Sequence, residues 1–248
     1  MVYQPQFDSA MNGLIGFEAL IRWSHPERGE IPPGDFISVA EKMNLMDKIG
    51  SYVLDSACRF ASTWETPADG VELKVAVNVS PQQFRNPLFM QTVRDTLSRH
   101  DLPAERLELE ITEDVLVHDF SEVSSILAQL REIGVAVAVD DFGSGQTSLR
   151  YLNQFPISTI KIDRSFIKHL AKDSKAAEIT RTIVALGHRL GVTVLAEGVE
   201  ESDQLDLLQQ WSCDHIQGFL SGRPMGVNDV ETLLSAAAGD KSLLKKSA

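Results

Sequence analysis

Three things that this sequence has little of exclude whole classes of protein. Its 248 residues include 2 cysteines, Cys58 and Cys213, which lie far apart and make no disulfide framework, so a reducing compartment suits the chain. Basic residues are also few, because 23 lysines and arginines face 35 aspartates and glutamates, a formal net charge of -12. This balance argues against duplex nucleic acid as a partner, since contacts to its phosphates need lysine and arginine. A small phosphate substrate stays open, because bound cations reverse the local field.

Long apolar runs are missing as well. No apolar stretch comes near about 18 residues and no signal peptide is visible, so the sequence predicts a soluble, cytoplasmic chain with no membrane segment. The first residues run directly into a strand-like segment, which suggests a domain of a longer parent, either cytoplasmic or the cytoplasmic part of a membrane-anchored protein. We expect one folded domain over residues 1–238, followed by a short polar tail over residues 239–248.

What the sequence does contain is a strand that ends in two acids. Residues 134–145 read GVAVAVDDFGSG, in which valine alternates with alanine up to Asp140 and Asp141. Such alternation is typical of a strand. Two adjacent carboxylates would cost several kcal/mol if they were buried without a cation, so the pair indicates a site rather than a simple turn.

Other short apolar segments end in the same way, in polar or charged residues, and each is followed by a helix-like segment. These residues are Glu18, Leu20 and Arg22 on a strand at 14–23, Asn78 at 73–80, Glu110 and Glu113 at 107–113, Lys161 and Asp163 at 159–163, Glu197 and Glu200 at 193–200, and Gln217 at 215–218. A first strand at 2–8 is joined to the second by a hairpin around residues 10–13.

Strands and helices that alternate in this way predict a parallel sheet, either open and doubly wound or closed into a barrel. An open sheet would take its site residues from a few strands at one switch point, whereas nearly every strand contributes to this set, as at the carboxyl face of a barrel. Counting by twos places the polar residues on one face with Ala76, Ala138 and Leu195, and the valines on the face where helices would pack. We therefore predict an α/β fold, a modified (β/α)8 TIM-type barrel with an irregular first strand. The same parity points Lys74 and Glu108 into the barrel floor, where we expect them to contact each other or a shared polar partner.

The donor atoms at the strand ends are almost all oxygen, with one lysine among them. None of the 6 histidines lies at metal-ligand spacing, and oxygen-only ligands select hard cations such as Mg²⁺, Mn²⁺ or Ca²⁺. Two such ions about 3.5–4 Å apart clamp the attacking and leaving oxygens in phosphoryl displacement. The adjacent Asp140 and Asp141 suit that arrangement, because one carboxylate can bridge while the next reaches the second ion.

Each residue by itself also has a structural explanation. A single acid such as Glu110 can cap a helix or pair with a base, and Glu200 could be an N-cap residue. Arg22 could neutralise the acids instead of binding a substrate phosphate. Taken together, five or more converging acids around one lysine favour a metal site over these explanations.

Seven motifs follow one another along the chain: GFEALIRW at 16–23, NVS at 78–80, EITE at 110–113, DDFG at 140–143, KID at 161–163, AEGVE at 196–200 and QGF at 217–219. With these motifs the chain closely resembles the EAL domain family, bacterial phosphodiesterases that linearise cyclic di-GMP. The resemblance runs from Tyr3 to Pro224 and implies a modified barrel whose first strand is antiparallel.

The resemblance also implies roles for the matching residues. One Mg²⁺ or Mn²⁺ ion would be held by Glu18, Asn78, Glu110 and Asp140. Asp140 would bridge to a second ion held with Asp141 and supported by Glu197. Lys161 would help to deprotonate the attacking water, and Glu113 would brace the loop at 142–148. The substrate would meet Leu20, Arg22, Asp163, Glu200 and Gln217. Ca²⁺ should inhibit, because it favours longer bonds and higher coordination. One departure is Gln146, where family members often carry an aromatic residue.

Two other functions stay open. The chain could be a catalytically silent cyclic di-GMP receptor, although it has lost none of the metal ligands nor the lysine. It could also be a Schiff-base enzyme, but a lysine that is surrounded by acids stays charged and is then a poor nucleophile. We further expect a homodimer, and an upstream sensory or GGDEF domain in the parent protein.

Overall fold

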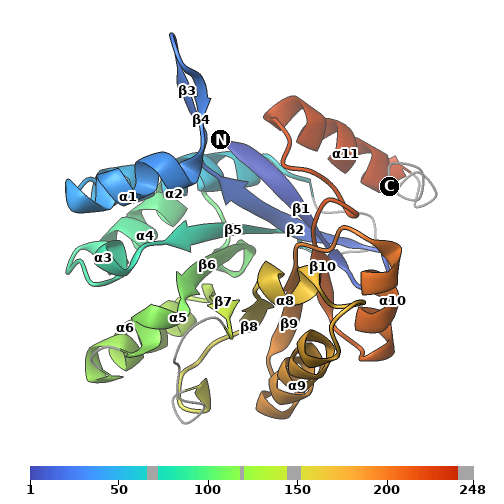
Figure 1. The fold of residues 1–248 in the computed structure, drawn as a ribbon. Helices are drawn as coiled ribbons and strands as arrows, with labels where there is room; N and C mark the ends of the chain where they lie inside the picture. The colour runs from blue at the N-terminus through green and yellow to red at the C-terminus, as the bar shows by residue number, and fades with distance from the viewer. Residues whose placement is uncertain (66–71, 118–119, 144–151, 240–248) are drawn as a thin grey trace.

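Residues 1–65, 72–117, 120–143 and 152–239 are described in a computed structural model, in which eight strands close into a barrel with helices outside it (Figure 1). The strands neighbour one another in the order β1-β10-β9-β8-β7-β6-β5-β2. They are β1 (Val2–Asp8), β2 (Leu14–Leu20), β5 (Lys74–Val79), β6 (Leu107–Thr112), β7 (Ala136–Phe142), β8 (Thr159–Ile162), β9 (Thr193–Glu197) and β10 (His215–Gln217). The predicted α/β barrel is confirmed.

The first strand is the irregular one. It pairs antiparallel with both neighbours, β2 and β10, whereas the other barrel strands pair parallel. The antiparallel pair follows from the predicted hairpin, in which the Asp8 N–H donates to the Gly13 carbonyl at 3.0 Å and the Asn12 N–H donates to Asp8 Oδ1 at 2.8 Å. Because β1 runs backwards, its first residues lie beside the carboxyl ends of the other strands, with Gln4 opposite Glu18.

The second strand is shorter than the sequence predicted. It ends at Leu20, and the chain then forms a separate two-stranded sheet from β3 (Trp23–His25) and β4 (Gly29–Ile31), which projects from the barrel in Figure 1. The Trp23 ring packs edge-on against Phe36 of the following helix, with ring centroids 5.6 Å apart, so Trp23 connects the β3-β4 hairpin to that helix. Arg22 therefore does not continue the parity of β2, and that part of the strand prediction is wrong.

The helices of the described chain cover the outside of the barrel. They are α1 (Pro33–Lys42), α2 (Met46–Ala61), α3 (Pro81–Phe84), α4 (Phe89–Arg99), a 3-10 turn η1 (Ala104–Arg106), α5 (Glu113–Val117), α6 (Phe120–Glu132), α8 (Arg164–Lys168), α9 (Ser174–Leu190), α10 (Ser202–Gln210) and α11 (Val227–Gly239). The valines on the outward parity, such as Val75 and Val137, are fully buried beneath this layer. None of the helices in the described ranges is long and apolar enough to cross a membrane. Of the predicted tail, residues 240–248 lie outside the described residues.

The inward parity predicted from the sequence is correct at both ends of the barrel. At the floor, Lys74 Nζ lies 3.8 Å from Glu108 Oε2, and Thr159 Oγ1 donates to the same oxygen at 3.0 Å. The predicted contact between the two charged residues is thus confirmed. The Glu108 side chain is 7% exposed but that of Lys74 is 45% exposed, so the lysine reaches solvent at the rim of the floor.

Candidate active site

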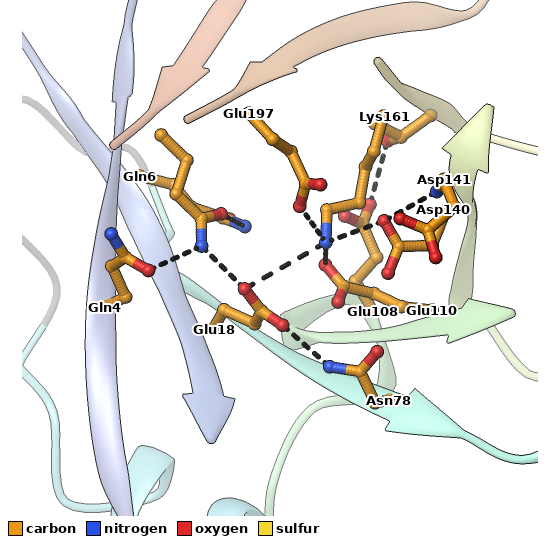
Figure 2. A network of polar contacts seen from close by, with 12 residues as sticks. Gln4, Gln6, Glu18, Asn78, Glu108, Glu110, Asp140, Asp141, Lys161 and Glu197 are labelled. Carbon is orange, nitrogen blue, oxygen red and sulfur yellow. Dashed lines mark hydrogen bonds and ion pairs between the residues drawn. The ribbon is translucent and has the colours of Figure 1, made fainter. Parts of the chain in front are cut away.

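The predicted polar residues gather at the carboxyl ends of the barrel strands (Figure 2). Neighbouring strands bring them together by register: Asn78 lies opposite Glu110, and Glu197 lies opposite Gln217. In each strand, successive side chains point to opposite faces. Because the valines pack outward against the helices, the polar residues between them point into the barrel. Residues that are far apart in the sequence thus share one small volume inside the barrel.

Lys161 is the centre of this volume. Its side chain is 1% exposed, and Nζ lies close to four carboxylates (Figure 2). The distances are 2.7 Å to Glu110 Oε1, 2.8 Å to Glu197 Oε1, 3.3 Å to Asp140 Oδ1 and 4.0 Å to Glu18 Oε2. Burial lowers the pKa of Lys161, but the surrounding carboxylates outweigh burial and hold that pKa well above its usual value. The ammonium group therefore stays charged and forms ion pairs with several acids at once.

One ammonium group does not satisfy this many acids. Burial raises the pKa of Glu110 against the pull of Lys161, and nearby carboxylates raise it further, to well above its usual value. Burial, with Asp140 and Glu18, likewise raises the pKa of Glu197 to about 8, although Lys161 lowers it. Acids whose charged forms are disfavoured in this way are the groups that a bound cation would stabilise.

Two further observations fit a metal ion. Ligand oxygens of Asp140, Asp141 and Glu197 all lie within 4.8 Å of one another. Both carboxylate oxygens of Glu110 are buried, and apart from the ion pair of Oε1 with Lys161 at 2.7 Å neither accepts a hydrogen bond from the described residues. The donor set is oxygen-only apart from the lysine, which fits a hard divalent cation.

A distortion of β7 turns its two acids toward the mouth of the barrel. The pairing of β7 with β8 shifts between Val139 and Phe142, and Asp141 adopts a φ of 53°. The Asp141 N–H donates to Asp140 Oδ1 at 3.0 Å. In a regular strand two successive side chains would point to opposite faces, whereas a bulge redirects one of them. The sequence predicted that both acids serve the site, but this distortion was not predicted.

Glu113 lies beside the chain that follows β7. It is the first residue of α5 and is 5% exposed, and its Oε2 accepts a hydrogen bond from the Gly143 N–H at 3.2 Å. Gly143 has a φ of 97°, which a residue with a side chain rarely adopts. The contact lies at the beginning of the predicted loop 142–148, of which residues 144–148, Gln146 among them, lie outside the described residues.

Of the predicted substrate-binding residues, Gln217 contacts an acid directly, because its Nε2 donates to Glu18 Oε2 at 2.6 Å. Arg22 Nε pairs with Glu30 Oε1 of β4 at 3.4 Å, and among the described residues it makes no ion pair with the strand-end acids. The alternative in which Arg22 neutralises the acids therefore has no support. Leu20 is half-buried at the end of β2. Gln217 is buried, at 4% exposed, inside the barrel.

Asp163 and Glu200 follow the carboxyl ends of β8 and β9. Asp163 is the N-cap of α8, where Oδ1 accepts from the Ser165 N–H at 2.9 Å. Glu200 is exposed, and the N-cap of α10 is Glu201, so the alternative of Glu200 as that cap is wrong. Both predicted residues line a cavity of about 950 Å³ between α8 and α10.

Two buried glutamines next to the site were not predicted from the sequence. Gln4 and Gln6 of β1 point into the barrel and join the network around Glu18 (Figure 2). Their signal was available, because they share a parity on a strand that was itself predicted.

A family model described as the EAL domain matches residues 1–224. The chain belongs to the EAL domain family. This EAL domain is 44% identical over 238 residues to the bifunctional diguanylate cyclase/cyclic di-GMP phosphodiesterase MucR of Pseudomonas aeruginosa, a match that covers 95% of the chain and 34% of MucR. It is 40% identical over 232 residues to the signaling protein YkoW of Bacillus subtilis, covering 94% of the chain and 29% of YkoW.

Solved structures agree with these matches. The PaMucR phosphodiesterase in complex with c-di-GMP has a TM-score of 0.88 to this EAL domain at 44% sequence identity, over 92% of each chain. The EAL domain of Mycobacterium smegmatis DcpA has a TM-score of 0.79 at 31% identity, over 96% of each chain. The chain thus corresponds in length to solved EAL domains, but spans only 34% and 29% of MucR and YkoW.

Proposed function

We propose that this EAL domain is a two-metal phosphodiesterase that hydrolyses cyclic di-GMP to linear pGpG. The observation that carries the proposal is the cluster around Lys161, in which one buried ammonium group faces four carboxylates and Asp141 lies beside them. The identity to MucR, whose name includes this activity, supports the choice of substrate.

The residues divide into metal ligands and substrate contacts in this proposal. Glu18, Asn78, Glu110 and Asp140 would hold one Mg²⁺ or Mn²⁺ ion, and Asp140 and Asp141, supported by Glu197, would hold the second. Bound divalent ions supply an activated water and neutralise charge on the transferred phosphate. Leu20, Arg22, Asp163 and Glu200 contact the substrate, and Gln217 completes the shell from inside the barrel.

Lys161 assists proton transfer from the attacking water. Its Nζ is within reach of the carboxylates that face the mouth, but only a neutral amine can accept a proton. The same four carboxylates keep it charged in this structure. Lys161 can therefore act as a base only when other cations neutralise these acids. Its role as a base thus depends on metal ions being bound at the site. Glu113 acts indirectly, by holding the start of the loop after Asp141.

The alternatives are weaker on the same observations. A Schiff-base mechanism needs a neutral lysine in an apolar pocket, whereas Lys161 faces four acids. A silent receptor needs no complete metal site, whereas every residue in the proposed ligand set is present. A homodimer, a cytoplasmic location and partner domains in a longer protein stay predictions.

The test is incubation of the purified domain with cyclic di-GMP, followed by chromatography of the products. Linear pGpG should form with Mg²⁺ or Mn²⁺ and not in EDTA, and Glu18→Ala should abolish its formation. Full activity in EDTA, or binding of cyclic di-GMP without any cleavage under all metal conditions, would contradict the proposal.

A further inference from the structure

We infer that Gln6 sets, through Gln217, the direction in which the carboxylate of Glu18 is held, and that Gln6 is therefore a positioning residue for the metal site. The inference rests on the proposed function in that Glu18 is taken to be a metal ligand. It starts from three glutamines inside the barrel: Gln4, Gln6 and Gln217 are 9%, 3% and 4% exposed. Buried amides of this kind need hydrogen-bond partners.

The amide of Gln217 connects all the other members of this network. Its Nε2 donates to Glu18 Oε2 at 2.6 Å and to Gln4 Oε1 at 3.2 Å, so both of its N–H groups are used. Its Oε1 accepts from Gln6 Nε2 at 2.8 Å. Gln4 in turn donates from Nε2 to the Gly222 carbonyl at 3.1 Å.

Only one orientation of the Gln217 amide satisfies all of these hydrogen bonds. An ionised carboxylate accepts hydrogen bonds and cannot donate, so Gln217 must turn its NH₂ group toward Glu18. The oxygen of Gln217 must then face Gln6, so Gln6 must donate a hydrogen bond to it from its own NH₂ group. If the Gln217 amide were reversed, its oxygen would face Glu18 Oε2, and two acceptors would meet in a buried place.

The antiparallel first strand is what makes this network possible. The register of β1 places Gln6 opposite Gln217 of β10 and Gln4 opposite Glu18 of β2. Both glutamines therefore point into the barrel between the two strands that carry their partners (Figure 2).

The other oxygen of Glu18 is held from the opposite side. Asn78 Nδ2 donates to Glu18 Oε1 at 2.6 Å, so an amide fixes each carboxylate oxygen. Partners that orient a ligand in this way lower the cost of ordering it when the metal binds, and their loss typically weakens metal binding by about 10–100-fold. Gln6 donates its hydrogen bond to Gln217 and not to Glu18, but the direction of the Gln217 amide depends on it.

Two charge-matched variants separate this role from simple electrostatics. Gln6→Glu puts an acceptor where Gln217 needs a donor, which favours the reversed amide. Gln4→Glu adds the same charge on the other side of Gln217 and keeps an acceptor toward Gln217, while its second oxygen replaces the donor to the Gly222 carbonyl. An added negative charge alone should tighten cation binding in both variants.

The measurement is Mn²⁺ binding to the metal-free domain at pH 8, by electron paramagnetic resonance of the free ion. We expect Gln6→Glu to bind Mn²⁺ about tenfold more weakly than the wild type, and Gln4→Glu to bind it equally or more tightly. The neutral Gln6→Met only deprives Gln217 of a donor and does not favour the reversed amide, so it should weaken binding by about threefold, below the range of about 10–100-fold for the loss of a partner that orients a ligand directly. Thermal melts of all variants show whether each is folded. The inference is overturned if Gln6→Glu binds as tightly as Gln4→Glu, or, should Gln6→Glu not fold, if Gln6→Met binds like the wild type.

A second readout needs no metal. Nuclear Overhauser contacts between the side-chain amide protons of Gln217 and the γ protons of Glu18 should be present in the wild type and in Gln4→Glu, and lost in Gln6→Glu. If the wild type binds no Mn²⁺ but these contacts change as expected, the proposed function fails while the control of Glu18 by Gln6 stands. Contacts that persist in Gln6→Glu would overturn the inference itself.

Discussion

Lys161 shows how much a single residue carries in this protein. Its ammonium group is buried among Glu18, Glu110, Asp140 and Glu197, and these acids face one another wherever the lysine does not reach. A buried charge that loses its partner is costly, so the fold itself depends on this side chain when no metal is bound.

Lys161→Met should lower the free energy of unfolding in EDTA by about 3–5 kcal/mol, because it leaves the carboxylates without their shared cation. Mn²⁺ should restore part of the loss, since it supplies the missing charge. Urea denaturation at pH 8 with and without Mn²⁺ measures both effects. The control is Lys172→Met, whose side chain is 74% exposed and pairs at 3.9 Å with Glu201, itself 56% exposed, and whose expected loss is below about 1 kcal/mol. Equal losses in the two variants would contradict this account.

Glu113 is the second residue whose role can be tested by itself. Glu113→Ala removes the acceptor for the Gly143 N–H, so the chain after Asp141 should lose its support while the fold remains. We expect kcat to fall about tenfold or more and the Mg²⁺ concentration for half-maximal rate to rise. Asp114→Ala, at the exposed next position of α5, is the matched control and should behave like the wild type. Unchanged kinetics of Glu113→Ala across a Mg²⁺ titration would show that this glutamate has no role in the site.

At the scale of the element, strands β7 and β1 do what a regular parallel barrel could not. The register shift in β7 turns two consecutive acids toward one site. The reversed direction of β1 brings Gln4 and Gln6 to the strands that carry Glu18 and Gln217. The shift in β7 supplies a side chain that alternation alone would not, and the antiparallel register of β1 supplies partners for Glu18 and Gln217.

Strand β10 makes the stability of the barrel depend on pH through His215 at its start. Burial lowers the pKa of His215 below its usual 6.5, against the carboxylates of Asp214, Glu108 and Asp8, while Lys74 adds to the lowering. The unfolded chain therefore binds this proton more readily, so the stabilisation is complete above about pH 6.5 and is lost as the pH falls below it. Urea denaturation between pH 5 and 7.5, run at about half-unit steps, should show a smaller loss of stability toward acid in His215→Gln than in the wild type. Parallel pH profiles for the two proteins would contradict this assignment.

At the scale of the whole molecule, the barrel gathers acids from β2, β6, β7 and β9 against one lysine, within a chain of net charge -12. Divalent ions that bind the folded state alone should therefore raise the melting temperature, by an amount equivalent to about 2.7 kcal/mol at 100 times the dissociation constant. Mg²⁺ and Mn²⁺ should stabilise and support cleavage of cyclic di-GMP, whereas Ca²⁺ should stabilise but inhibit, because its longer bonds loosen the two-ion geometry. Melting curves and product chromatography in each ion test this. A Ca²⁺ form as active as the Mg²⁺ form would refute the geometric argument.

The sequence by itself determined the barrel and most of its site. Alternating valines and strand-end acids follow from the period of a strand, so local residues were enough to predict which side chains, Glu110 and Lys161 among them, point inward. The tertiary structure decided where β2 ends, how Asp141 turns into the site and which way the Gln217 amide faces. These features depend on the register between strands and on partners distant in the chain, such as Gln6 and Gln217, which are 211 residues apart. No local pattern encodes such a pairing, because a hydrogen bond between two side chains exists only once both strands are in place.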